Sequence, residues 1–103
     1  MRRPDDQIQK DPSSVEPQGF DWTAYLLELG SSVQIATSVW SFTGADAVLV
    51  LDDDIIVSGN LKTQVMISAG TLGRRYTVTN RITTNSTPPV IDDRSFVVLV
   101  QER

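Results

Sequence analysis

The chain has 103 residues, of which nine are basic and thirteen acidic, and its formal net charge is −4. This length fits one domain with a single two-layer core. The absence of Cys and His excludes disulfides, histidine acid–base chemistry and Ser-His or Cys-His catalysis, and it leaves zinc without its usual ligands. The acidic balance argues against a nucleic-acid binder, and no apolar run approaches the ~20 residues that span a bilayer.

Residues 1–19 differ in composition from the rest of the chain. They hold three prolines and several charges, but only Ile8 and Val15 as branched apolar side chains. Such a segment buries too little apolar surface to offset its ordering entropy. We therefore expect an extended N-terminal arm over residues 1–19, either frayed or ordered only against a partner, followed by one domain over residues 20–103.

The sequence FDWTAYLLELG, which follows the expected arm, predicts one short helix at about residues 21–29. Asp21 is a suitable N-cap, and Gly30 stands where a left-handed residue ends a helix. Apolar side chains at i, i+3, i+4 and i+7 form one helical stripe, which consists of Trp22, Tyr25, Leu26 and Leu29. We expect this stripe to pack on an open edge or end of a β core. An exposed docking face is the alternative.

Beyond residue 30 the pattern is that of β-strands, expected at residues 33–42, 47–51, 55–57, 61–69, 74–84 and 95–101. The first of these has three apolar side chains on one parity, Val33, Ile35 and Val39. The second is apolar throughout, as in a central strand. Six to seven short strands indicate an all-β fold, either an immunoglobulin-like β-sandwich or a small barrel, although the Cys…Trp…Cys hallmark of antibody domains is absent.

The strand at residues 74–84 has the clearest alternation. Its apolar side chains share one parity, and they are Tyr76, Val78 and Ile82. Its polar side chains share the other parity, and they are Thr77, Thr79, Arg81 and Thr83. A period of two is typical of a half-buried strand.

Two loops resemble ligand sites but favour simpler interpretations. Asp52, Asp53 and Asp54 are oxygen ligands of the kind that Ca²⁺ prefers, yet neither the glycine nor the closing glutamate of a calcium loop follows. We interpret them as a solvated turn between strands. Residues 70–73 lack the Lys-Ser/Thr ending of a phosphate loop and precede a strand, which favours a hairpin turn. No cofactor or metal is expected.

Asp92 and Asp93 form a carboxylate pair next to Arg94. Adjacent residues in a strand face opposite sides of the sheet, so the two carboxylates would not share one catalytic site. We interpret residues 92–94 as a turn whose carboxylates either pair with Arg94 or contact a neighbouring protein. No catalytic residues are expected anywhere in the chain.

The order of several short motifs resembles that of a known group of proteins. These motifs are Lys10-Asp11-Pro12, Phe20-Asp21-Trp22, Ala69-Gly70-Thr71-Leu72-Gly73, Tyr76-Thr77-Val78-Thr79-Asn80, Ile82-Thr83-Thr84, Asp93-Arg94-Ser95-Phe96 and the terminal sequence VLVQER. The chain resembles small structural proteins encoded among the morphogenesis genes of tailed bacteriophages, in particular the phage fibre–tail adaptor proteins with immunoglobulin-like β domains. It departs from them at residues 85–89, where a shorter, glycine-bearing turn is expected.

The resemblance implies a virion component, assembled in the bacterial host cytoplasm and without enzymatic activity. It implies an oligomeric adaptor, arranged as a homo-oligomeric ring, that joins tail or neck to fibres or to an adjacent ring protein. Its partners would be other virion proteins of the tail, connector or fibre. One alternative is a head–tail joining or capsid decoration protein. Another is a free-standing immunoglobulin-like module for carbohydrate or protein, which would need exposed aromatic side chains among Trp40, Phe42 and Tyr76.

Two segments are the candidate partner-binding sites. An arm that lies along a neighbour's sheet edge supplies main-chain hydrogen bonds without a large core. Its candidate residues are Ile8, Lys10, Asp11, Pro12 and Val15. The second segment is the connection before the last strand, with the candidates Pro88, Pro89, Asp92, Asp93 and Arg94.

Overall fold

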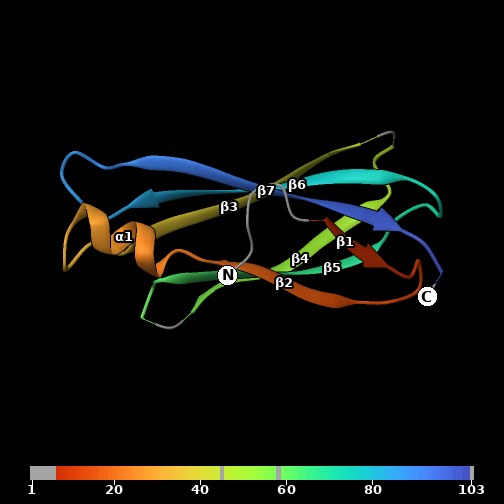
Figure 1. Ribbon diagram of the computed structural model, residues 1–103, viewed down its shortest axis with the longest axis horizontal. Coiled ribbons are helices and arrows are strands. Elements are labelled where there is room, and N and C mark those ends of the chain that lie inside the picture. The colour runs from red at the N-terminus through yellow and green to blue at the C-terminus, as the bar shows by residue number, and fades with distance from the viewer. Residues whose placement is uncertain (1–6, 45, 58, 103) are drawn as a thin grey trace.

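The computed structural model describes residues 7–44, 46–57 and 59–102. Two β-sheets pack face to face, and one short helix lies at one end of them (Figure 1). The elements in chain order are β1 (Gln7–Lys10), β2 (Glu16–Asp21), α1 (Thr23–Leu29), β3 (Ile35–Gly44), β4 (Leu49–Val57), β5 (Lys62–Ala69), β6 (Arg75–Thr84) and β7 (Ile91–Val100).

The seven strands form a four-stranded sheet A and a three-stranded sheet B. The order in sheet A is β1-β7-β6-β3, and the order in sheet B is β2-β5-β4. Only the β1–β7 pair is parallel among the described strands. The molecule is elongated, with extents of 43 × 22 × 21 Å. The expectation of a mostly β, sandwich-like protein with one short helix is confirmed.

The core lies between the sheets and follows the expected period of two. Along β6 every second side chain is buried, and the buried apolar ones are those predicted, Tyr76, Val78 and Ile82. Phe20 of sheet B packs on two aromatic rings of sheet A, with centroids 6.0 Å from Trp40 and 5.6 Å from Phe96. Burying one such large side chain contributes roughly 1.5 to 3 kcal/mol, so these contacts hold the two sheets together.

Helix α1 closes one end of the sandwich, as the apolar stripe predicted. Trp22 and Leu26 are fully buried, whereas Leu29 remains 41% exposed because α1 is short and lies at the rim. The N-cap position belongs to Trp22 and not to Asp21. Asp21 is the last residue of β2, and its carboxylate accepts the N–H of Thr23 at 2.9 Å. Gly30 ends the helix with a φ of 159°, far from the left-handed helical value that was expected.

The expected separation between an arm and a domain at residue 19 is wrong for residues 7–19. Strand β1 pairs with β7 in sheet A, and β2 pairs with β5 in sheet B. Composition misled because main-chain pairing with β7 and β5 attaches these strands to their sheets, although they carry few apolar side chains, of which Ile8 packs against the core. Residues 1–6, the start of the expected arm, lie outside the described residues.

Two bulges change the expected faces of strands. Ile35 and Val39 do not share the core face, because the register of β3 shifts between Ile35 and Thr37. Ile35 is buried, but Val39 is 58% exposed. In β4 the register shifts between Asp52 and Ile55. The three aspartates therefore form a bulge within one strand, where Asp53 has a φ of 50°, and not a turn between two strands.

Three further expectations need correction. The residues 47–51, expected in a central strand, lie largely in β4, which is an edge strand of sheet B. Residues 70–73 join β5 of sheet B to β6 of sheet A, so they cross between sheets and form no hairpin. Strand β7 starts at Ile91, earlier than predicted, and includes residues 92–94, which were expected in a turn.

Candidate partner-binding surface

Lys10 is fully buried, so it is not available for a partner. Its Nζ donates to the carbonyl oxygens of Asp11 and Ala69, both at 2.8 Å. Because Ala69 ends β5 in sheet B and Lys10 ends β1 in sheet A, the ammonium group joins the two sheets at one end of the sandwich. A buried lysine requires such partners, since an unpaired charge inside a protein is costly.

The turn after β1 is ordered by its own side chains. The carboxylate of Asp11 accepts the N–H of Ser13 at 2.9 Å and its hydroxyl at 2.7 Å. Pro12 lies in this turn and is half-buried. Val15 follows it with 61% of its surface exposed, whereas Ile8 packs against the core. Of the five candidates near the N-terminus, Val15 alone presents a largely exposed apolar side chain.

Pro88 and Pro89 are exposed in the connection between β6 and β7. This connection lies at the same end of the molecule as α1 (Figure 1). It is anchored at its start, because the N–H of Asn85 donates to the carbonyl oxygen of Gln34 and the N–H of Gln34 donates to Oδ1 of Asn85, each at 2.9 Å. These hydrogen bonds fix the start of the connection that carries the two prolines.

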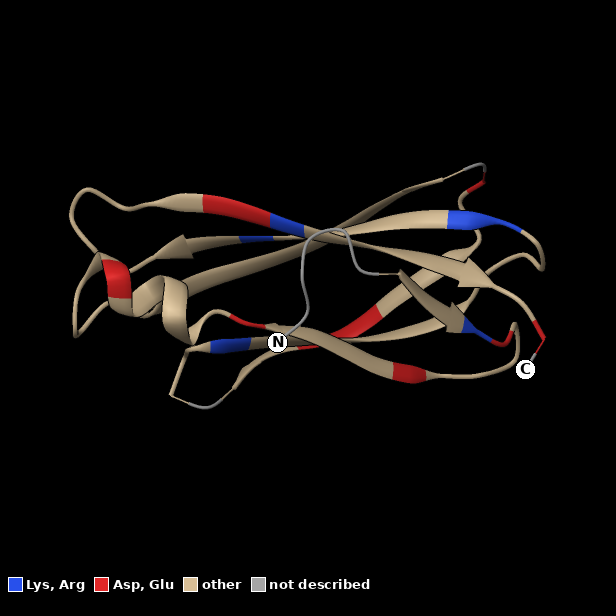
Figure 2. Ribbon diagram, viewed as in Figure 1, with Lys and Arg blue, Asp and Glu red and all other residues tan. Residues whose placement is uncertain are grey.

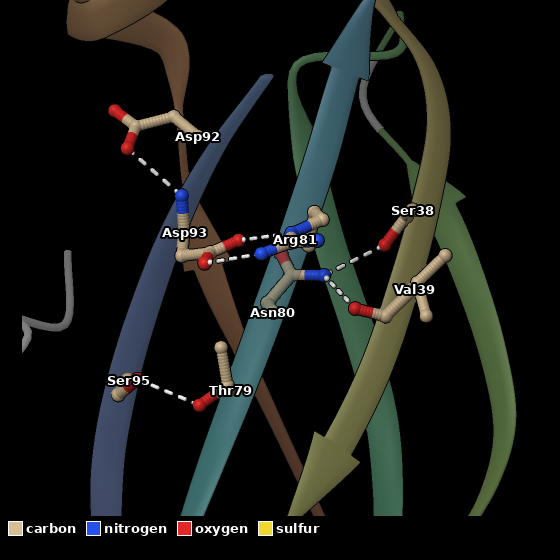
Figure 3. Close-up of polar contacts among 8 residues, drawn as sticks. All are labelled: Ser38, Val39, Thr79, Asn80, Arg81, Asp92, Asp93 and Ser95. Atoms are coloured by element: carbon tan, nitrogen blue, oxygen red, sulfur yellow. Dashed lines mark hydrogen bonds and ion pairs between the residues drawn. The ribbon is translucent and has the colours of Figure 1, made fainter.

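Asp93 and Arg81 form an ion pair across β7 and β6 on the outer face of sheet A (Figure 3). Nε and Nη2 of Arg81 donate to the two carboxylate oxygens at 2.8 and 3.0 Å. The hydrogen bond with Arg81 lowers the pKa of Asp93, and the same bond raises the pKa of Arg81. Because both side chains are largely exposed, the pair contributes little to stability.

Arg94 faces the other side of β7 and holds helix α1. Its guanidinium lies 4.3 Å from the ring centroid of Trp22 and 5.7 Å from that of Tyr25. Nη1 of Arg94 donates to the carbonyl oxygen of Asp21 at 3.2 Å. Burial raises the pKa of Tyr25, and a hydrogen bond with Asp92 adds to this effect. Asp92 and Arg94 therefore interact with side chains in or next to the helix, whereas Asp93 interacts with Arg81 on the outer face of sheet A.

A polar cluster inside the sandwich centres on Asn80, which is fully buried. Its Oδ1 accepts hydrogen bonds from Nε1 of Trp22 at 3.1 Å and from the hydroxyl of Thr63 at 2.7 Å. Its Nδ2 donates to Oγ of Ser38 at 2.8 Å and to the carbonyl oxygen of Val39 at 3.4 Å (Figure 3). Asn80 thus links both sheets with the start of α1. Its role is structural.

The sequence reasoning missed the outer face of sheet A as a candidate surface. Its central strand β6 presents the polar side chains whose shared parity was noted, Thr77, Thr79, Arg81 and Thr83. Thr79 and Ser95 share a hydrogen bond at 2.8 Å on this face (Figure 3). On β3 the exposed side chain of Val39 belongs to the same face. The alternation pattern placed Val39 in the core, because it does not reveal the bulge between Ile35 and Thr37.

The described residues form neither a metal-binding cluster nor a membrane-spanning helix. Among them, no three acidic side chains gather closely enough to hold a metal ion, and no helix is long and apolar enough to cross a membrane. Acidic and basic side chains are interspersed over both sheets (Figure 2). The aromatic side chains that a carbohydrate-binding module would need are Trp40, Phe42 and Tyr76. Tyr76 is buried, and the other two pack against the core.

Fold and surface together define a small structural β-sandwich protein whose polar side chains serve packing and surface contact. The chain belongs to the family of the podophage GP4 fiber-tail adaptor protein gp77, whose family model matches residues 10–99. It is a structural adaptor of the virion, a component of the podophage tail and not an enzyme. The resemblance to phage fibre–tail adaptors is therefore confirmed. No curated protein and no solved structure matches the chain.

Proposed function

We propose that the chain bridges a tail protein and a fibre protein through the two opposite ends of its sandwich. The observation that carries this proposal is the separation of the candidate residues along a body 43 Å long and only 22 × 21 Å across. Residues 11–15 lie at one end, and the prolines of the β6–β7 connection lie at the other (Figure 1). An adaptor needs two contact surfaces that do not overlap, and this shape provides them.

The first surface, here called the turn end, consists of residues 11–15 and 70–74. Val15 and Leu72 are its exposed apolar side chains. The loop around Leu72 is held in place, because Thr71 donates its hydroxyl to Asp46 at 2.9 Å and its N–H to the hydroxyl of Tyr76, also at 2.9 Å. A fixed apolar surface binds without a large cost of ordering.

The second surface, here called the helix end, consists of α1 and residues 85–91. Leu27 is 66% exposed on the helix, and Ile91, Pro88 and Pro89 are exposed at the same end of the molecule (Figure 1). A shallow hollow next to the helix is lined by Thr23, Leu27, Gly30, Ser31, Val33 and Leu61. Leu27 is both exposed and part of the lining of this hollow, and exposed apolar side chains are typical of protein contact surfaces.

Matched surface variants test the two-ended arrangement. Val15→Asp with Leu72→Asp should abolish binding at the turn end, and Leu27→Asp with Ile91→Asp should abolish binding at the helix end. Purified tail and fibre proteins are then mixed with each variant and analysed by size-exclusion chromatography. We expect each variant to lose one neighbour and retain the other. If both variants bind both neighbours as the unmodified chain does, the two-ended proposal is wrong.

We also propose that several copies associate in the virion as a ring. A ring forms when a heterologous contact between copies closes by rotation. The elongated shape supports this arrangement, because copies can lie side by side while both ends stay accessible. Counting copies in tail complexes by native mass spectrometry tests it, and a single copy per tail would contradict it.

We further propose that the sandwich is immunoglobulin-like. The orders β2-β5-β4 and β3-β6-β7 correspond to the B-E-D and C-F-G strands of that fold. The hydroxyl of Tyr76, near the start of β6, binds the N–H of Thr71 five residues upstream, which fits a tyrosine corner. Trp40 on β3 packs on Phe20 at the centre of the core. An experimental structure with a different strand order would contradict the proposal.

A further inference from the structure

The four outer strands of the sandwich differ in how their free edges are protected. An edge strand presents unpaired N–H and C=O groups, and proteins blunt such edges with short length, proline, charge or a bulge. β1 has only four residues, and β2 contains Pro17. β4 carries a bulge and three aspartates. Each of these three edges therefore discourages pairing with another chain.

β3 has none of these devices over most of its length. It has ten residues, IATSVWSFTG, with neither charge nor proline, and it is free of charge along its whole ribbon in Figure 2. Its register with β6 is irregular only between Ile35 and Thr37, and regular pairing continues from there to Gly44. In the described part of the chain, main-chain bonds outside the sheets reach Ile35 but no residue from 36 to 44.

The side chains beside this edge suit a second strand. The solvent-facing positions are exposed and carry short, uncharged side chains, namely Thr37, Val39, Ser41 and Thr43. Cross-strand pairs of threonine and of β-branched residues stabilise a sheet, and like charges directly opposite each other destabilise it. A second copy of β3 brings the favourable pairs and no charge. A second copy of β4 would bring three carboxylates without a basic partner on β3.

We propose that β3 of one copy pairs antiparallel with β3 of a second copy, so that two A sheets become one continuous sheet. The contact is self-complementary, as a two-fold interface requires. This inference goes beyond the proposed function and concerns the free chain. β3 runs along the long axis, so its antiparallel pairing points the two copies in opposite directions, whereas a ring that joins tail to fibre needs all copies to face the same way. The ring therefore uses a different contact between copies, formed after the pair separates.

Val39 is the residue at which the pairing is tested. It lies near the middle of β3, so an antiparallel pairing centred on the middle of the strand places the two copies of residue 39 opposite or diagonal to each other. Val39→Lys and Val39→Glu should each weaken self-association by at least about tenfold, because like charges then meet across the interface. An equimolar mixture of the two variants should restore it.

Sedimentation velocity over a range of concentrations provides the measurement, and thermal unfolding verifies that each variant is folded. Ile55→Lys is the matched control, because Ile55 is 47% exposed on the edge strand β4. It should leave self-association unchanged. The proposal is overturned if the unmodified chain is a monomer at all concentrations, if Val39→Lys associates like the unmodified chain, or if the mixture of variants stays monomeric.

Incorporation into tail complexes separates this inference from the adaptor function. If the unmodified chain is monomeric but still joins tail and fibre proteins, the β3 pairing is wrong and the proposed function stands. If the chain pairs through β3 but joins neither protein, the β3 pairing stands and the proposed adaptor function is wrong. If a monomeric chain loses a virion partner on Val39→Lys, a strand of that partner occupies the edge, and the second copy is excluded.

Discussion

Replacing Asn80 with alanine should destabilise the sandwich strongly, because this fully buried side chain links both sheets. The change removes three hydrogen bonds of 2.7 to 3.1 Å and a longer one of 3.4 Å, and polar groups of Trp22, Thr63 and Ser38 lose Asn80 as a partner. At about 1 kcal/mol for each bond, with a further contribution from the small cavity, the loss is about 3 to 4 kcal/mol. That is a large share of the roughly 5 to 15 kcal/mol that stabilises a domain.

Thermal and urea unfolding, followed by circular dichroism, measure this loss. For a domain of this size we expect the melting temperature to fall by roughly 15 to 25 °C. Thr79→Ala is the matched control, because Thr79 is the neighbouring residue on the opposite face and loses one half-exposed hydrogen bond with Ser95. It should cost about 1 kcal/mol or less.

A double-mutant cycle with Thr63→Val tests the mechanism of the Asn80 effect. Because the hydroxyl of Thr63 donates to Oδ1 of Asn80 at 2.7 Å, the two substitutions should be non-additive by about 0.5 to 3 kcal/mol. The reasoning is refuted if Asn80→Ala costs no more than Thr79→Ala. It is also refuted if the two effects in the cycle simply add.

Three other predictions follow from single contacts, all measured by thermal unfolding. Gly19→Ala should cost about 3 kcal/mol, because the new Cβ would lie 2.0 Å from the carbonyl oxygen of Thr63 and force β2 away from β5. Lys10→Ala should cost about 2 to 3 kcal/mol, because two carbonyl oxygens, one of them that of Ala69, lose a charged donor. Asp46→Asn should reduce the loss of stability on acidification, because hydrogen bonds lower the pKa of Asp46 below its ordinary value of 3.8.

A control or a contradicting outcome can be named for the glycine and the aspartate substitutions. Gly59→Ala is the control for Gly19, because no atom lies within 4 Å of the added Cβ, although its φ of 70° adds some backbone strain. An equal effect at both glycines would contradict the steric argument. For Asp46, a lowered folded-state pKa contributes stability above the unfolded value and loses it as the pH falls through the folded value. An unchanged acid profile in Asp46→Asn would show that other carboxylates dominate.

The sequence pattern predicted the parts of the fold in which side-chain period and burial agree. The alternation around Tyr76, Val78 and Ile82 gave the inner face of β6, and the stripe with Trp22 and Leu26 gave the buried face of the helix. These predictions are correct because a two-layer core forces each element to bury one face.

The pattern failed where main-chain geometry decides the structure. A bulge after Ile35 moved Val39 to the outer face, and another at Asp53 let β4 continue through three charges. The pattern of polar and apolar side chains does not reveal the position of either bulge. The first two strands were missed because they are attached by hydrogen bonds to β7 and β5, which are distant in sequence.

Contacts between residues that are distant in sequence also explain why two of the candidate partner-binding residues are not available to a partner. Lys10 was proposed as a partner contact because it lies in the expected arm, and Arg94 because it lies in the connection before the last strand. The fold instead uses both internally, Lys10 on the carbonyl of Ala69 and Arg94 on the ring of Trp22. Val15, Pro88 and Pro89 remain exposed, and they stay candidates for partner contact.

The parallel pairing of β1 with β7 has a consequence for synthesis. The first and the last described strands lie side by side, with Gln7 opposite Val97 and Lys10 opposite Val100 (Figure 1). During translation β1 therefore cannot pair until β7 has left the ribosome, and such long-range pairing is slow. A product that stops before β7 lacks the neighbour of both β1 and β6, so prematurely terminated copies cannot complete sheet A and compete for places in the tail.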